Sequence, residues 1–202
     1  MSSFFHIDIA HLVQTFGMLG LSFIVFAETG LSFGFFFPGD SLLFTAGVLA
    51  SQGFLNIWIM IPSLIVSAIL GDSFGYWFGA KIGPKIFSRE DSFFFRKRHI
   101  ERTHAFYMKY GAKAIFLARF VPIVRTFAPI LAGVGSMPYK TFVRYNSIGG
   151  FAWVGGVTLL GYFFGKTVPH IDQYLTPIIV VIIFVSFLPI VYEVLKEKKV
   201  NK

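Results

Sequence analysis

AIFLARFVPIVRTFAPILAGVG, residues 114–135, is the stretch that decides the fold. It is apolar enough to enter a bilayer, but two prolines interrupt it and it carries Arg119 and Arg125. Because a proline removes a backbone donor and clashes with the preceding turn, the stretch is not expected to form one unbroken helix. Unpaired backbone groups are not tolerated against lipid, so the break must lie within protein or line a wet cavity. The stretch therefore predicts a re-entrant helical hairpin.

A second apolar stretch is broken in the same way. FFFPGDSLLFTAGVLA, residues 35–50, carries a proline and Asp40 in mid-run, and it predicts a second hairpin. A short helix is expected after each break, beginning near Ser41 and near Phe127. Helix N-termini carry partial positive charge and free N–H groups, so both starts favour an anion. Ser41 and Thr126 are candidate supporting residues at these starts.

The longer apolar stretches place the chain in a membrane. Hydrophobic residues make up 55% of the sequence and charged residues only 14%, whereas soluble domains carry about 25% charged residues. A helix needs about 20 residues to cross the hydrocarbon core. Four stretches approach or exceed that length: 12–37, 57–80, 147–165 and 174–195. We expect an all-α integral membrane protein, with residues 1–202 forming one membrane domain.

The chain also repeats itself. The sequence Ala-Gly-Val at 46–48 recurs at 132–134, and Gly-Tyr-Trp-Phe-Gly at 75–79 recurs as Gly-Tyr-Phe-Phe-Gly at 161–165, both at an offset of 86 residues. Two ungapped matches at one offset indicate an internal duplication. Each unit would hold a hairpin and a full span. The predicted units are 10–82 and 97–168, and the helix at 174–195 is an addition.

Basic residues predict the orientation of the units. Residues 1–80 contain no Lys or Arg, whereas 81–113 contain nine, and the C-terminal tail is again basic. A net charge of +8 can indicate nucleic-acid binding, but short basic loops at membrane spans are typical of the cytoplasmic side. We therefore expect 81–113 and the C-terminus to be cytoplasmic. The two hairpins then enter from opposite faces, as in the inverted repeats of transporters.

The segment 88–109 mixes aromatic residues with many cations and predicts an amphipathic helix in the cytoplasmic interface. Its histidines, His99 and His104, are five positions apart and do not share a helix face. No metal site and no cofactor are therefore expected.

Five ionisable residues fall inside the broken or spanning segments: Glu28, Asp40, Asp72, Arg119 and Arg125. Each charge at a helix centre costs about 2.5–3.5 kcal/mol on insertion scales, so such groups pair with one another or touch a substrate. One interpretation is an ion-pair network that only holds the hairpins. The other is a site in which two guanidiniums offer planar, bidentate donors to phosphate.

The three carboxyl groups are expected to have different roles. Glu28 lies on a helix of Phe, Val and Ala, and it is a candidate for exchanging a proton as phosphate arrives or leaves. Asp40 is a second candidate, but it could equally cap the helix that begins at Ser41. Asp72, in a Gly-Asp-Ser setting, is a possible supporting residue that could instead serve helix packing.

At these residues the sequence resembles the DedA family of bacterial membrane proteins, which is related to the VTT-domain lipid scramblases of eukaryotes. The resemblance lies in Glu28, then Pro38-Gly39-Asp40, then Gly75-Tyr76 with Gly79, and then the segment 116–125 followed by Pro129 and Ala132-Gly133. It covers about 28–165. The arginine–proline segment is its most specific part.

The resemblance implies two opposed re-entrant hairpins in the bacterial cytoplasmic membrane. It implies a flippase that returns undecaprenyl phosphate, the lipid carrier of cell-wall sugars, to the inner leaflet with the proton motive force. It also implies that Glu28, Asp40, Arg119 and Arg125 are the essential residues. The expected partners are a phosphate-headed isoprenoid lipid, the bilayer and protons, with no nucleic acid and with a homo-oligomer left open.

Other interpretations remain beside this one. Three intramembrane acids against two arginines would permit a proton-coupled cation antiporter. A general phospholipid scramblase is a second alternative, and a structural membrane protein is a third. A lipid phosphatase would need a nucleophile or a metal in the site, but cysteine is absent and every histidine lies outside the broken tips, so we expect no enzyme.

Overall fold

The structure, a computed structural model, describes residues 9–31, 39–87, 111–169 and 171–174, with 177, 178, 180 and 181. Every regular element in these ranges is a helix, so the all-helical expectation is confirmed for the described part of the chain. The elements are α1 (Ile9–Gly30), α2 (Gly39–Ser51), α3 (Ile57–Phe87), α5 (Lys113–Ala118), α6 (Pro122–Val134), α7 (Tyr139–Gly150), η2 (Phe151–Gly155), α8 (Gly156–Thr167) and η3 (Ile171–Tyr174).

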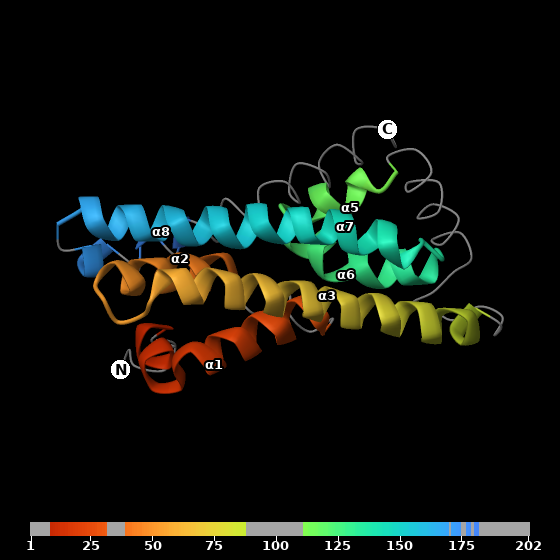
Figure 1. The fold of residues 1–202 in the computed structure, drawn as a ribbon, viewed down its shortest axis with the longest axis horizontal. Helices are drawn as coiled ribbons and strands as arrows, with labels where there is room; N and C mark the ends of the chain where they lie inside the picture. Colours follow the sequence, from red (N-terminus) through yellow and green to blue (C-terminus); the bar gives the residue numbers. More distant parts are fainter. Residues whose placement is uncertain are drawn as a thin grey trace, which may run out of the picture.

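Two long helices form the frame of the molecule. In the described ranges, Ile57–Lys81 within α3 and the continuous helix Tyr139–Thr167, made of α7, η2 and α8, are long and apolar enough to cross a bilayer. The two helices contact each other and run in opposite directions (Figure 1). The second helix begins earlier than the predicted 147–165, because α7 starts directly after Pro138, in a polar turn outside the apolar run.

Helix α1 is broken near its start. Gly17 has a φ of 57°, which L side chains rarely adopt, and the apolar helix that follows runs only to Gly30. This helix is shorter than the predicted stretch 12–37, and it is too short to span a bilayer. It crosses α3 where Gly30 meets the backbone of Gly71, so the two helices approach closely without side chains between them.

Short helix α2 lies along α8, in the half of the molecule that also holds the start of α3 (Figure 1). Glycines make this contact possible. A Cβ at Gly47 would collide with the backbone of Thr158, and a Cβ at Gly161 would collide with the backbone of Phe44. The helix axes are therefore closer than side chains on both faces would allow.

Short helix α6 lies along α3, in the other half of the molecule (Figure 1). Here a Cβ at Gly133 would collide with the backbone of Tyr76, and one at Gly79 would collide with that of Ile130. Gly47 and Gly133 are the glycines of the repeated Ala-Gly-Val. Each of them contacts the long helix of the other predicted unit.

The break before α6 has a clear local cause. Helix α5 ends at Ala118, Val121 takes an extended conformation, and α6 begins at Pro122. The start is earlier than the expected Phe127, because proline at the first helical position has the right φ and needs no hydrogen-bonded N–H. Arg125 therefore lies in the first turn of α6. Likewise, α2 includes Gly39 and Asp40 rather than beginning at Ser41.

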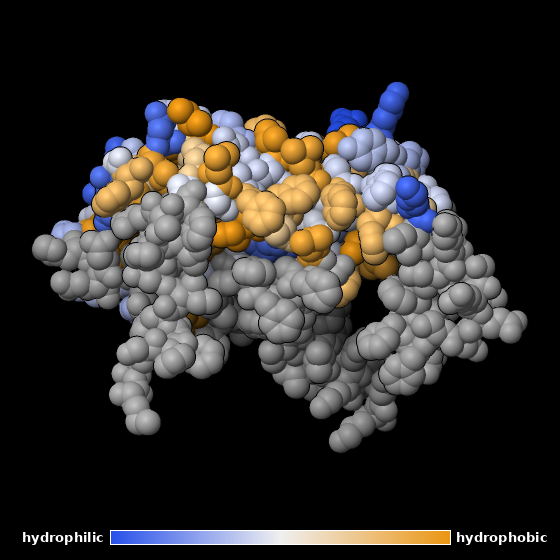
Figure 2. Space-filling model, turned by 90° about the horizontal axis from the view of Figure 1, so that it is seen from below, coloured by the Kyte–Doolittle hydropathy of each residue, from blue (hydrophilic) through white to orange (hydrophobic). Residues whose placement is uncertain are grey.

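The described surface suits a lipid environment. Large apolar side chains on the long helices are exposed, among them Trp58, Leu70, Phe151 and Phe163. Figure 2 shows hydrophobic residues gathered across the middle of the visible face, with hydrophilic residues toward its two ends. The amphipathic helix expected at 88–109 with its histidines, most of 174–195, and the first residues of the unit 97–168 lie outside the described residues.

Candidate functional site

The starts of α2 and α6 meet halfway along the two long helices (Figure 1). Asp72 is the central residue of α3, and Trp153 is the central residue of the helix Tyr139–Thr167. The meeting point is thus deep in the apolar part of the molecule. All five ionisable residues singled out from the sequence come together there in two linked groups.

The first group is centred on Arg125. Its Nη2 donates to Oε1 of Glu28 at 2.8 Å, and its Nη1 donates to Oδ1 of Asp40 at 3.0 Å. Arg125 and Glu28 are buried, while the Asp40 side chain keeps 21% of its surface exposed. One guanidinium at the start of α6 therefore ties together the end of α1 and the start of α2.

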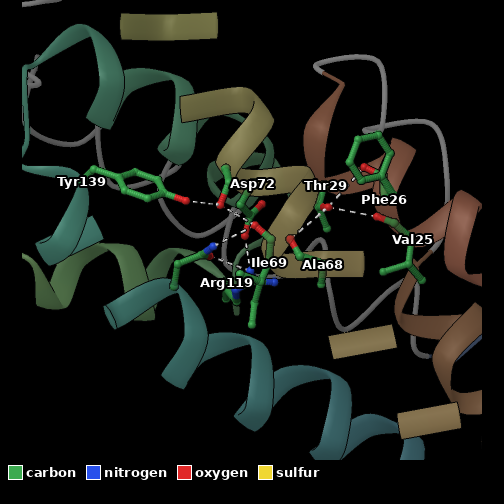
Figure 3. A network of polar contacts seen from close by, with 10 residues as sticks. Val25, Phe26, Thr29, Ala68, Ile69, Asp72, Arg119 and Tyr139 are labelled. Carbon is green, nitrogen blue, oxygen red and sulfur yellow. Dashed lines mark hydrogen bonds and ion pairs between the residues drawn. The ribbon is translucent and has the colours of Figure 1, made fainter. Parts of the chain in front are cut away.

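The second group is centred on Arg119, which follows the last residue of α5. Its Nη2 donates to Oδ2 of Asp72 and to Oδ1 of Asn146, the latter at 2.6 Å. Figure 3 shows the guanidinium directed at Asp72 on α3. A Cβ at Gly149 would lie 3.0 Å from Cδ of Arg119, so the glycine makes room for this side chain.

Hydrogen bonds that link α1 and α7 to α3 lie beside the charged residues (Figure 3). The Thr29 hydroxyl lies 3.0 Å from the carbonyl oxygen of Val25 and 3.4 Å from that of Ala68, which links α1 to α3 beside Glu28. The hydroxyl groups of Tyr139 and Ser73 are 3.2 Å apart and link α7 to α3 beside Asp72. Helices α1 and α3, which carry Glu28 and Asp72, are thus held in a fixed position relative to their neighbours.

Trp153 joins the two groups. Its indole N–H donates to Oδ1 of Asp40 at 2.6 Å. The Arg125 guanidinium carbon lies 4.3 Å from the ring centroid and that of Arg119 lies 5.8 Å away, both within the range of cation–π attraction. Trp153 is buried, and it lies in the π-helical turn η2.

Sequence reasoning missed Trp153 and Asn146. Trp153 carries a polar group inside the apolar stretch 147–165, and Asn146 lies directly before that stretch; each needs a partner there because lipid supplies none. That requirement was the available signal. The pair Gly149-Gly150 was a second one, since residues without side chains leave room for a bulky neighbour to approach the helix.

The charges in the site are nearly balanced. Three carboxylates face two guanidiniums, and Glu28, Asp72, Arg119 and Arg125 are all at most 5% exposed. Breaking one buried pair leaves an uncompensated charge, which costs about 3–5 kcal/mol. The network therefore holds the starts of α2 and α6 firmly in place between the other helices.

Several guanidinium donors are not used by the network. Within the described part of the chain, Nε and Nη1 of Arg119 and Nε of Arg125 are buried and have no hydrogen-bond partner. A guanidinium has five N–H donors in a planar fork that matches the oxygens of a phosphate or carboxylate. The site can therefore bind an anionic oxygen without first losing all of its internal ion pairs.

The remaining predicted residues lie beside the network. Ser41 and Thr126 are buried, one position along the chain from Asp40 and Arg125. Their supporting roles stay predictions. Asp40 lies in the first turn of α2, and its Oδ1 is engaged by Arg125 and Trp153. A Cβ at the neighbouring Gly39 would collide with the Glu28 carboxylate, so the carboxylate would have to move if Gly39 carried a side chain.

Comparison with known proteins gives a consistent result. The profile of the VTT domain matches residues 37–163. Protein DedA of Escherichia coli strain K12 is 48% identical over 201 residues, covering 96% of this chain and 91% of that protein. An uncharacterized membrane protein of Mycobacterium leprae is 48% identical over 166 residues, covering 82% of this chain and 74% of that protein. No solved structure matches this chain.

Proposed function

Because this chain belongs to the VTT-domain (DedA) family of membrane proteins, we propose that it is a transporter that moves a polyprenyl phosphate, such as undecaprenyl phosphate, between the leaflets of the bilayer. The observation that carries the proposal is the pair of buried arginines with unused donors at the meeting point of the hairpin starts. The phosphate head binds Arg119 and Arg125. The isoprenoid chain stays against the exposed apolar side chains of the long helices.

The proposed architecture is an inverted repeat of units 10–82 and 97–168 within one membrane domain. Two observations support it. Helices α2 and α6 occupy opposite halves of the frame (Figure 1), and the repeated glycines Gly47 and Gly133 make corresponding close contacts. Each hairpin then opens to one face of the bacterial cytoplasmic membrane, with 81–113 and the C-terminus in the cytoplasm.

The way Arg125 is held supports proton coupling. Glu28 and Asp40 both occupy this guanidinium, so an incoming phosphate competes with two carboxylates for it. Protonation of one carboxyl group removes its charge and weakens its hold on Arg125. A proton that enters from outside thus favours phosphate binding, and release of that proton to the cytoplasm restores the ion pair and expels the lipid.

A reconstituted system tests the proposal. The purified protein in liposomes is expected to move a polyprenyl phosphate from one leaflet to the other, and to move the uncharged polyprenol more slowly, because the arginines lose their charged partner. The leaflet distribution is measured with a membrane-impermeant phosphatase. Equal transport rates for the polyprenyl phosphate and the polyprenol would mean that the arginines do not distinguish the charged head group from the uncharged one.

The excess of one carboxylate over the arginines favours a second candidate, a proton-coupled cation antiporter. The same liposomes separate the two. If they exchange Na⁺ or K⁺ for protons while the lipid phosphate stays in place, the antiporter replaces the flippase. Movement of ordinary phospholipids at the same rate as the polyprenyl phosphate would instead indicate a general scramblase.

A further inference from the structure

We propose that Trp153 is the positioning residue that sets how readily Arg125 passes from its carboxylates to the lipid phosphate. The inference rests on the proposed function and deepens it. Trp153 has two separate contacts with the site, one through the edge of the indole and one through its face. Each contact acts on a different member of the same ion pair.

The edge contact acts on Asp40. The indole N–H and Nη1 of Arg125 donate to the same oxygen, Oδ1, at 2.6 and 3.0 Å. A carboxylate oxygen that is shared by two donors is less dependent on either one. The indole hydrogen bond therefore makes the Asp40 carboxylate less dependent on Arg125 as a donor. It also keeps the carboxylate in place when the arginine turns toward a phosphate.

The face contact acts on Arg125. With its carbon 4.3 Å from the ring centroid, the guanidinium is attracted to the negative face of the ring, and tryptophan is the side chain best suited to this. Its Nη1 and Nη2 are used by carboxylates, whereas Nε has no partner in the described residues. The ring thus keeps the cation in the site while its hydrogen-bond partners change.

Trp153 lies in a π-helical turn, Phe151–Gly155. A π turn holds one more residue than an α turn, so side chains after it are rotated by about 100° relative to a regular helix. Such turns are frequent at functional sites. Within the turn, Trp153 is buried in the site, whereas Phe151, two positions earlier, is 62% exposed on the outside.

Substitution of the indole separates the two contacts. Trp153→Phe keeps an aromatic face but loses the N–H donor. Asp40 then depends more on Arg125, so we expect the affinity for a short-chain prenyl phosphate to fall about five- to tenfold, the usual effect of one lost hydrogen bond. The maximal transport rate should change less than twofold. Trp153→Leu should bind more weakly still, because the ring face is lost as well.

The matched control is Trp77→Phe. Trp77 also lies under a cation, with Nζ of Lys81 4.5 Å from its ring, but it is exposed and stands outside the site. Its substitution should leave both affinity and rate as in the parent. Thermal unfolding of every variant in detergent confirms that it is folded, and Trp153→Leu, alone and with Asp40→Ala, replaces Trp153→Phe if the latter does not fold.

A double substitution tests whether the indole acts through Asp40. In an Asp40→Ala background the indole N–H has no carboxylate to hold, so adding Trp153→Phe should not weaken prenyl phosphate binding further. Binding is measured by calorimetric titration of the protein in nanodiscs. An unchanged affinity in Trp153→Phe, or an equal loss with and without Asp40, overturns the positioning role. A parent protein that binds no prenyl phosphate overturns the proposed function itself, and the positioning role with it.

Discussion

At the scale of single residues, the two arginines have different surroundings. Arg125 is shared by Glu28 and Asp40, which come from α1 and α2, whereas Arg119 is held by Asp72 and Asn146 on the two long helices. A carboxylate pair that can exchange partners suits a moving substrate. A single carboxylate backed by an amide suits a fixed anchor. We therefore expect substitutions in the two groups to differ in their effects.

Arg125→Ala is expected to abolish lipid phosphate transport while the protein still inserts into the membrane. Arg125→Lys should recover little, because an ammonium is a point charge and loses the planar fork that engages two oxygens. Arg144→Ala, which removes an exposed arginine of α7, is the control and should transport normally. Transport by Arg125→Ala at the parent rate in the liposome assay would remove the phosphate site from consideration.

Asp72→Ala is expected to act mainly on stability. It leaves Arg119 buried with only Asn146 as a described partner, and breaking such a pair costs about 3–5 kcal/mol. Asp72→Asn should cost less, because the amide oxygen still accepts a hydrogen bond. Thermal unfolding in detergent measures both. A midpoint for Asp72→Ala within a degree of the parent would show that this ion pair is not an anchor.

Glu28→Gln tests proton coupling. The amide cannot take up a proton, so the variant is expected to lose the response of the transport rate to an imposed pH gradient, while Glu28→Asp keeps part of it. The rate is measured in liposomes with and without an acidic exterior. If Glu28→Gln responds to the gradient like the parent, the Glu28 carboxylate is structural and the proton is carried elsewhere.

At the scale of elements, the fold depends on glycines where short helices cross long ones. Gly161 faces the backbone of Phe44 on α2, and Gly133 faces that of Tyr76 on α3. Because the obstructing atoms belong to the backbone, a side chain at these glycines cannot be accommodated by a change of rotamer. The helix crossings, and with them the positions of α2 and α6, depend on these contacts.

Gly161→Ala is therefore expected to separate α8 from α2, with a loss of about 1–3 kcal/mol or more, as in overpacked cores. Gly156→Ala is a control on the same helix, because a Cβ at Gly156 meets no atom within 4 Å. Comparison of their thermal unfolding midpoints isolates the crossing from helix propensity. Equal midpoints for the two variants would contradict the close crossing.

At the scale of the whole molecule, the two ends of the frame differ. The connection between α2 and α3 lies at one end and the connection between α6 and α7 lies at the other (Figure 1). In the proposed topology these ends face opposite sides of the membrane. The proposal places the end with the α6–α7 connection in the cytoplasm, because the segment 81–113 is basic.

Single cysteines test this arrangement cleanly, because the chain has no cysteine of its own. Gln52→Cys and Ser136→Cys place exposed thiols in the two connections. We expect an impermeant maleimide to label Gln52→Cys only from outside the cell and Ser136→Cys only from the cytoplasm. Labelling of both positions from one side would overturn the inverted-repeat topology.

The sequence alone determined the helical membrane class of the protein, the apolar stretches in which its described helices lie and the charged members of its network. Apolar length, proline breaks and the cost of isolated charges in lipid are local properties, and they were enough to single out Glu28, Asp40, Asp72, Arg119 and Arg125. Only the tertiary structure decided which carboxylate pairs with which arginine, and that Trp153 and Asn146 join them. The physical reason is that a buried charge requires a partner but does not specify one. The partner is chosen by how distant helices pack, which no local pattern predicts.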